Sequence, residues 1–202
     1  MSGVISTGVA ALVSLACISA IQPTDVTEAE VYRVALTAVS RAALPTSQSG
    51  RGAQLRHALI ASTYDPSPLW RSNDEITRKH SPDLDPVQRL TYARPETVAA
   101  FLQAIQRPGR LPPLMGTLEQ FRLVEESEVP SEFEEWSAFQ QRTGLGVGAF
   151  SASHIGFDRS GTQALVYLAY SCGGLCASGR FVLLERRNAE WHVVKVDLYI
   201  ES

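Results

Sequence analysis

The sequence predicts an α+β domain in which an antiparallel sheet, formed mainly by the C-terminal third of the chain, packs against about three helices. Apolar residues at helical spacing occupy the earlier part of the chain, whereas strand-like runs separated by short turns fill residues 152–202. The chain has 202 residues, of which 45% are hydrophobic, enough to form one core. We therefore expect a single domain over residues 21–202.

The N-terminal segment carries no charged side chain before Asp25. Residues 3–20 are apolar and small, as in the hydrophobic region of a signal peptide, although the usual positively charged start is absent. We expect residues 1–20 to be a signal peptide. The mature chain would then begin near Ile21 and be exported, either to the periplasm or out of the cell.

Three other fates of this segment stay open. If residues 3–22 were retained as an anchor, they would be just long enough to span a bilayer, and the membrane would be a partner. Cys17 would carry a lipid if the segment were a lipoprotein signal, although Ser14 stands where that signal has leucine. The third alternative is a buried helix in a protein that is not exported.

Two cysteines remain once the signal peptide is removed, in the sequence Cys172-Gly-Gly-Leu-Cys176. An even pair this close together in an exported chain favours a disulfide bond. A metal site would need two further soft ligands, and none is spaced to supply them. A redox-active pair would need a helix N-terminus or a basic neighbour, whereas strands are predicted on both sides. We therefore expect a Cys172–Cys176 disulfide and no cofactor.

The first predicted helix spans residues 27–43. Thr27 and Glu30 form a capping box at its start, and Pro45 ends it. The apolar face is narrow, and the side chains expected on it are Val31, Val34, Ala35, Ala38 and Ala42.

Two further helices are predicted, at residues 95–106 and 131–143. A proline suits the first turn of the earlier helix, apolar residues recur in it at helical spacing, and a Pro-Gly pair stops it. The later helix would begin at a capping box of Ser131 and Glu134 and end at Gly144.

Strands and loops are predicted between these helices. Residues 55–63 are expected to form a strand, with a short helix as the alternative, and residues 118–124 to form another strand. Four prolines and mixed charge over residues 64–86 indicate an irregular surface loop. Trp70 is expected to anchor this loop, contact with a partner being the alternative.

The C-terminal segment predicts a four-stranded antiparallel meander. The expected strands are residues 154–158, 162–170, 180–186 and 191–200. The second strand is apolar on both faces, so it should be central and covered on both sides. In the last strand, alternate side chains from His192 to Ile200 should share the apolar face. A curled sheet with helices on its concave side, as in cystatin-like or nuclear-transport-factor-like folds, would accommodate these elements by analogy.

Composition and motifs argue against several classes of function. With 18 basic and 21 acidic side chains, the chain lacks the electrostatic signature of a nucleic-acid partner. The run over residues 144–149 has the spacing of a dinucleotide fingerprint, but a helix would precede it and a strand follow it, the reverse of what pyrophosphate binding needs. This run is therefore expected to be a flexible linker. The Gly-x-Ser-x-Gly elbow of a serine nucleophile does not occur.

The histidines lack metal-binding spacing, so each is expected to be structural; they are His57, His80, His154 and His192. His192 would form a nucleophilic pair only with a free Cys172 or Cys176, against which the predicted disulfide argues. Six glutamates over residues 125–135 are expected to form a solvated surface, with acid–base chemistry or calcium binding as the alternative. No catalytic residue is predicted.

Residues 131–202 also show a resemblance to a group of bacterial exported proteins. These proteins carry a cysteine-glycine-x-leucine-cysteine hairpin between two strands and a tryptophan that opens the last strand. The resemblance is carried by Gly156-Phe157, Thr162–Tyr167, Cys172–Cys176, Gly179, Val182–Glu185, Trp191 and Val194. Ala177 and the ending Tyr199–Ser202 depart from the pattern. The resemblance implies export and a disulfide, and no activity comes with it.

We therefore expect an exported, non-enzymatic module that binds a small ligand or another protein. The expectation depends on the predicted export, on the hairpin closed by a disulfide, and on the lack of a catalytic motif in the sequence. The alternative is a hydrolase that uses His192 or the acidic segment 125–135 in a cavity of the sheet.

Overall fold

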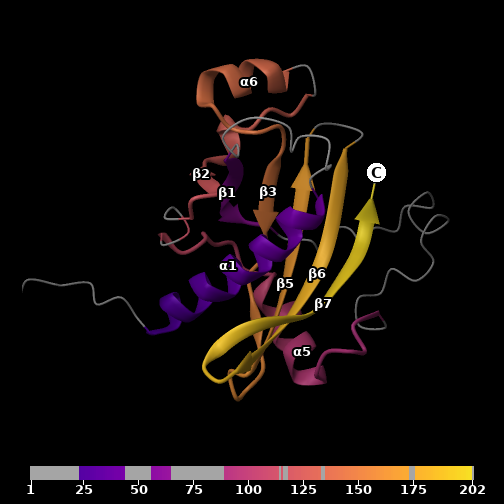
Figure 1. Cartoon of the computed structure of the whole chain (residues 1–202). Coiled ribbons are helices and arrows are strands. Elements are labelled where there is room, and N and C mark those ends of the chain that lie inside the picture. Colours follow the sequence, from indigo (N-terminus) through magenta and orange to yellow (C-terminus); the bar gives the residue numbers. More distant parts are fainter. Residues whose placement is uncertain are drawn as a thin grey trace, which may run out of the picture.

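In the computed structural model, the chain forms one sheet with helices on both of its faces (Figure 1). The residues that the structure describes are 23–43, 56–64, 89–113, 115, 118–132, 135–172 and 176–201. The predicted signal peptide, Trp70, His80 and all of the predicted loop 64–86 except Tyr64 lie outside these residues.

The described residues form three α-helices, one 3₁₀ turn and seven strands. The helices are α1 (Pro23–Ala43), α5 (Pro95–Ala104) and α6 (Trp136–Thr143), and the 3₁₀ turn is η3 (Glu126–Glu128). The strands are β1 (His57–Thr63), β2 (Phe121–Val124), β3 (Ala149–Ala152), β4 (Gly156–Phe157), β5 (Gln163–Ser171), β6 (Ala177–Arg187) and β7 (Glu190–Glu201). The chain is thus mixed α and β, as predicted.

The strand order is β2-β1-β3-β5-β6-β7, and β4 pairs with β5 beside β3. β5, β6 and β7 are antiparallel to one another, whereas β1 is parallel to both β2 and β3. The parallel part was not predicted. It arises because β1 connects to β2, and β2 to β3, through long segments that contain α5 and α6, and such crossovers are what parallel pairing requires. β3 itself was also missed by the sequence analysis.

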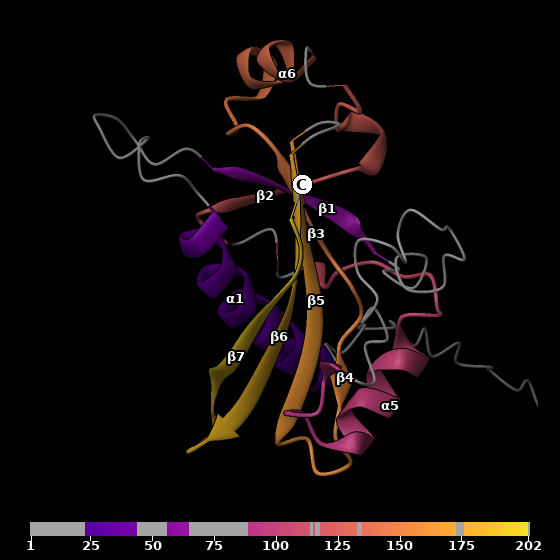
Figure 2. The ribbon, with the colours of Figure 1, turned by 90° about the vertical axis from the view of Figure 1, so that its right-hand side faces the viewer.

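Helices cover both faces of the sheet, as the edge-on view shows for α1 and α5 (Figure 2). On β5, Val166 belongs to the core under α1, while Leu165 and Tyr167 belong to the core under α5. The prediction of a central strand buried on both faces is therefore confirmed. α1 and α5 lie on opposite faces, because the alternating side chains of β5 give each face an apolar surface to cover.

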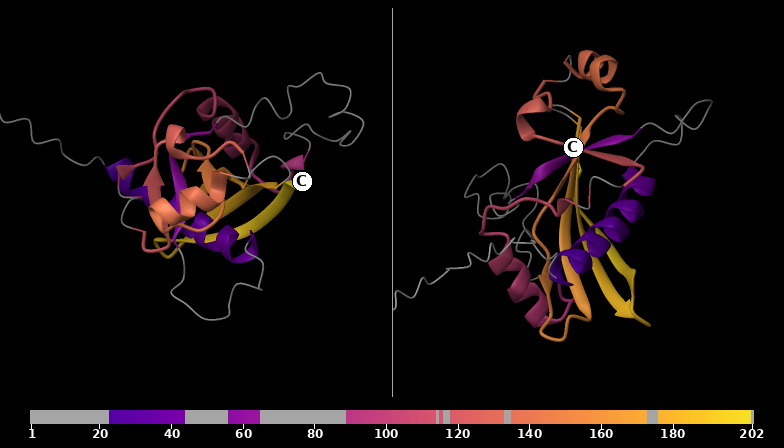
Figure 3. Two further views of the ribbon diagram at one scale, coloured as in Figure 1. Left: turned by 90° about the horizontal axis from the view of Figure 1, so that it is seen from above. Right: turned by 90° about the vertical axis from the view of Figure 1, so that its left-hand side faces the viewer.

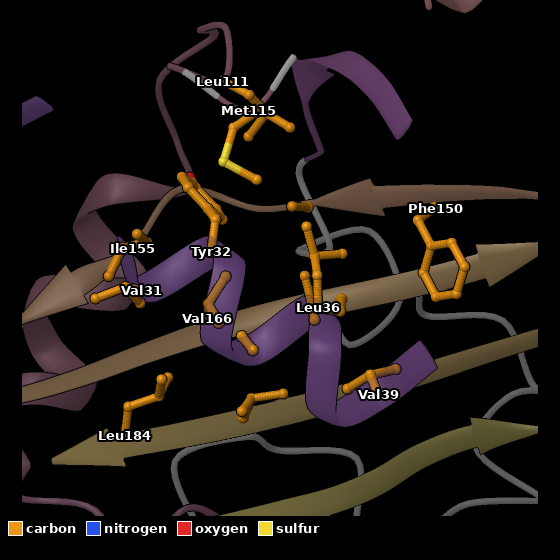
Figure 4. Close-up of a cluster of buried hydrophobic side chains, with 14 of the residues drawn as sticks. Val31, Tyr32, Leu36, Val39, Leu111, Met115, Phe150, Ile155, Val166 and Leu184 are labelled. Atoms are coloured by element: carbon orange, nitrogen blue, oxygen red, sulfur yellow. The ribbon is translucent and has the colours of Figure 1, made fainter. Parts of the chain in front are cut away.

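The larger core lies between α1 and the sheet, and it is extended by the segment that precedes β2 (Figure 4). Tyr32, Leu36 and Val39 of α1 point at the strands, and Leu111 and Met115 close the cluster from the side. The Tyr32 hydroxyl donates to the backbone oxygen of Ser153 at 2.8 Å. Burial raises the pKa of this hydroxyl well above its ordinary value, so it stays a neutral donor.

α1 differs from its prediction in both its start and its face. The helix begins at Pro23, where a missing N–H costs nothing, so Thr27 lies inside the helix and does not cap it. The fully buried positions include Val31, Tyr32, Ala35, Leu36 and Val39. The predicted face included Val34 and Ala38, which are only partly buried. The larger side chains of Tyr32 and Leu36 bury more apolar area than these residues would.

α5 matches its prediction to within two residues, with Pro95 in its first turn. α6 begins at Trp136, so the predicted start at Ser131 is wrong, although Gly144 ends the helix as expected. Gly144 adopts a left-handed φ of 70°, and its N–H donates to the oxygen of Gln140 at 2.8 Å. α6 packs over the β1 end of the sheet in a small core that includes Trp136, Phe139 and Ala58 (Figure 3).

Candidate functional site

Cys172 and Cys176 form a disulfide bond at the turn between β5 and β6, with their Cα atoms 5.3 Å apart. The backbone N–H of Cys172 also donates to the oxygen of Cys176 at 2.9 Å. The two cysteines therefore close the hairpin at the end where the β5–β6 ladder stops. Disulfide sulfurs are neither nucleophiles nor metal ligands in this form.

His192 lies in β7 opposite Glu185, at the end of β6 remote from the disulfide. Ala177, next to the disulfide, is about 26 Å away along β6 at the usual rise per residue. His192 is therefore too far from Cys172 and Cys176 to form a pair with either of them. Its predicted place on the apolar face is wrong, because a bulge at Val194 shifts the alternation and leaves His192 exposed.

Glutamates of the acidic segment 125–135 interact with residues close to them in the sequence. Glu125 forms an ion pair with Arg110, which lowers the pKa of the Glu125 carboxyl. Glu125 and Glu128 form a reciprocal capping box around η3, an element that was not predicted. The carboxylates of this segment that the structure describes lie at the surface, and the described residues contain no cluster of three His, Cys, Asp or Glu side chains that would hold a metal ion.

The glycine run 144–149 connects α6 to β3 and leads into a strand, as predicted. It is packed, however, and does not behave as a free linker. Gly148 has a left-handed φ of 84° and lies under Tyr170, whose hydroxyl donates to the oxygen of Val147 at 2.8 Å. Gly146 lies against the ring of His57.

Asp158 is the best-buried carboxylate among the described residues, and it was not singled out from the sequence. It accepts hydrogen bonds from the Ser160 hydroxyl and the N–H groups of Thr162 and Gln163 at 2.6, 2.7 and 2.9 Å, and it pairs with Arg94. Burial alone would raise the pKa of this carboxyl, but the hydrogen bonds outweigh burial and hold the pKa well below its usual range. The group is a structural anchor of the β4–β5 turn, because its lone pairs are already occupied.

A cavity of about 290 Å³ lies between α1 and the turn that leads into β2. Figure 2 shows this end of β2 beside α1. The lining residues are Arg33, Thr37, Leu118, Glu119, Gln120 and Phe121. Phe121 is buried, and Leu118 is partly buried against the same core, so together they form an apolar floor. Arg33 and Glu119 are exposed and bring opposite charges to the two walls.

The wall at residues 118–121 is held in place by the protein itself. The guanidinium of Arg56 donates to the oxygens of Phe121 and Leu118 at 2.5 and 3.4 Å. The N–H of His57 donates to the oxygen of Gln120 at 2.8 Å, which joins the wall to β1. Because these bonds involve backbone groups, the wall side chains are free to face the cavity, and the wall is formed before any ligand arrives.

None of the cavity residues was predicted as a site. Residues 118–124 were expected to form one strand, but β2 begins only at Phe121, and Leu118–Gln120 form the turn that makes the wall. Arg33 looks in sequence like any charged residue on the outer face of a helix. The two walls are far apart in the chain, so no local pattern could have indicated that they meet.

Comparison with known proteins adds no family to these observations. No helix in the described residues is both long enough and apolar enough to cross a membrane. No protein-family model, curated protein or solved structure matches this chain.

Proposed function

We propose that this protein is an exported, non-enzymatic module that binds a small ligand in the cavity between α1 and the turn before β2. The cavity is the observation that carries the proposal. Its volume is near the lower end of the range for small-molecule sites, and it combines an apolar floor with a few polar groups, as such sites do. Among the described residues its lining contains no histidine, cysteine or serine.

Export is supported by the uncharged N-terminal segment and by the Cys172–Cys176 disulfide, since disulfides persist mainly in oxidising compartments. The alternative hydrolase gains no support from the arrangement of its candidate groups. His192 lies on β7 near the β6–β7 turn, whereas the acidic segment 125–135 follows β2 at the other edge of the sheet.

The finer fold predictions also stay proposals. The antiparallel pairing of β4 with β5, β5 with β6 and β6 with β7 supports a four-stranded meander. Likeness to a cystatin-like or nuclear-transport-factor-like sheet has less support, because α1 and α5 lie on opposite faces.

A ligand-observed NMR screen of a chemically mixed small-molecule library against the full chain tests the proposed function. Thr37→Trp places a large ring into the cavity from the partly exposed face of α1, and we expect it to abolish the binding of every hit. The matched control is Gln103→Trp on the exposed face of α5, which should leave binding unchanged. Hits that survive Thr37→Trp, or a screen without hits, would contradict the proposal.

A further inference from the structure

The charges on the two walls of the cavity indicate which class of ligand it takes, an inference that rests on the proposed binding function. We propose that the ligand is a zwitterion with an apolar side chain, namely a free amino acid or a dipeptide. Arg33 would hold its carboxylate and Glu119 its ammonium group, while the side chain would lie on Leu118 and Phe121.

Arg33 is suited to a carboxylate because most of its donors are unused by the residues that the structure describes. Its described ion pair is with Glu30, three residues earlier on α1, at the long distance of 4.0 Å. The Arg33 side chain is 54% exposed, so it can turn toward the cavity without breaking a buried contact. A guanidinium has five N–H donors in a planar fork that matches a carboxylate with two parallel hydrogen bonds.

Glu119 supplies the opposite charge on the facing wall. It is exposed, and no ion pair engages its carboxylate within the described part of the chain. A carboxylate only accepts hydrogen bonds, and an ammonium group has three to donate. The side-chain amide oxygen of Gln120 and the Thr37 hydroxyl, which donates to the backbone oxygen of Arg33 at 2.7 Å and keeps a lone pair, provide the other two acceptors.

Ligands with a single charge fit this lining less well. An anion attracted by Arg33 would also face the carboxylates of Glu119 and Glu30, and a cation attracted by Glu119 would face Arg33. A zwitterion satisfies both walls at once. A volume of about 290 Å³ is enough to hold one or two residues.

Matched ligands test the two charges separately. The probes are L-leucine, leucyl-leucine, N-acetyl-L-leucine, which lacks the ammonium charge, and L-leucinamide, which lacks the carboxylate. We expect NMR titration of the full chain to show leucine and leucyl-leucine binding about fivefold more tightly than the other two, the effect of one partly exposed ion pair.

Variants assign each charge to its wall. In Glu119→Gln, leucine and N-acetyl-leucine should bind equally, while the preference over leucinamide remains. In Arg33→Gln, leucine and leucinamide should bind equally, while the preference over N-acetyl-leucine remains. Arg159→Gln, in the exposed turn between β4 and β5, is the charge-matched control and should behave as the wild type.

The inference is overturned if N-acetyl-leucine or leucinamide binds the wild type as tightly as leucine, or if none of the four binds up to about 10 mM. The proposed function is judged separately by the mixed screen. If other library compounds bind and Thr37→Trp abolishes their binding, the cavity is a ligand site and only the zwitterion is wrong. If neither the probes nor the library bind, both are wrong.

Discussion

Asp158 shows at the scale of one residue how this chain uses a buried charge. Its side chain is fully buried, but its carboxylate accepts three short hydrogen bonds from the turn that follows it and pairs with Arg94 from the start of α5. Buried charges persist only when they are paired and hydrogen-bonded in this way. The group joins a turn of the sheet to the helix that covers that face.

We predict that Asp158→Asn lowers the free energy of unfolding by about 2 kcal/mol, because an amide removes the charge that strengthens these hydrogen bonds. Urea denaturation at neutral pH measures the effect. The control is Asp197→Asn, whose ion pair with Arg89 spans 3.6 Å and is partly exposed, and which should cost less than about 1 kcal/mol. Equal costs for the two variants would contradict the structural role of Asp158.

His57 is a buried residue whose charged form the fold disfavours. Its ring contacts Phe121 and Phe150 at centroid distances of 6.1 and 5.8 Å, and its Nδ1 atom has no hydrogen-bond partner in the described residues. Burial lowers the pKa of His57, and likewise that of His154. Near and below the ordinary histidine pKa, the unfolded chain therefore binds more protons than the native state.

The sign of the pH dependence follows from this. The contribution of the neutral histidines to stability is complete above their unfolded pKa and is lost as the pH falls toward their folded pKa. We predict that the free energy of unfolding decreases between about pH 7.5 and pH 5, and that His57→Phe makes this decrease smaller. Urea denaturation across this range measures both. An unchanged slope in the variant would show that His57 does not titrate as proposed.

At the scale of elements, α5 was predicted closely because short sequence patterns indicate each of its features. A proline indicates its start, the helical spacing of apolar residues indicates its buried face, and a Pro-Gly pair indicates its end. α6 was placed too early because Ser131 and Glu134 match the pattern of a capping box, whereas the helix begins at Trp136. A capping motif is short, so it also occurs where no α-helix begins, and here a 3₁₀-type hydrogen bond from the N–H of Glu135 to the oxygen of Glu132 precedes α6. The buried face of α1 was predicted wrongly because it depends on which of its side chains contact the sheet.

The docking of α5 depends on Gly156 in β4. A Cβ atom at this position would overlap the backbone of Phe101 in α5, and a backbone cannot move aside as a flexible side chain can. We predict that Gly156→Ala destabilises the protein by about 3 kcal/mol. Gly144→Ala, where a Cβ meets nothing but φ is 70°, is the control and should cost about 1 kcal/mol. Similar losses in the two variants by thermal denaturation would contradict tight packing at Gly156.

At the scale of the whole molecule, two kinds of pairing meet at β3. The antiparallel strands β5–β7 follow one another through short turns, and the sequence analysis anticipated them. The parallel strands β1–β3 are joined through distant segments, and their pairing was not anticipated. The cavity lies at the parallel end of the sheet, where α1 meets the turn before β2.

Removal of the disulfide measures how much this bond contributes to the stability of the protein. We predict that the double variant Cys172→Ser, Cys176→Ser lowers the free energy of unfolding by about 2 kcal/mol, the chain-entropy value for so short a loop. Reductant should destabilise the wild type similarly and leave the variant unchanged.

Intact mass spectrometry tests the proposed export: protein recovered from the periplasm or the medium should begin near Ile21 and have both thiols oxidised. Recovery of a chain that keeps residues 1–20, or of two free thiols, would contradict the predicted export or the predicted pairing.

The sequence by itself determined the mixed α and β class, the central position of β5, the extent of α5 and the pairing of the two cysteines, because each depends on a local pattern or on a spacing of few residues. Only the tertiary structure decided that β1 pairs in parallel, that His192 points to solvent, and that Arg33 and Glu119 line the same cavity. Those features depend on which segments, far apart in the sequence, bury the most apolar area when they pack together. The total buried apolar area is a property of the whole chain.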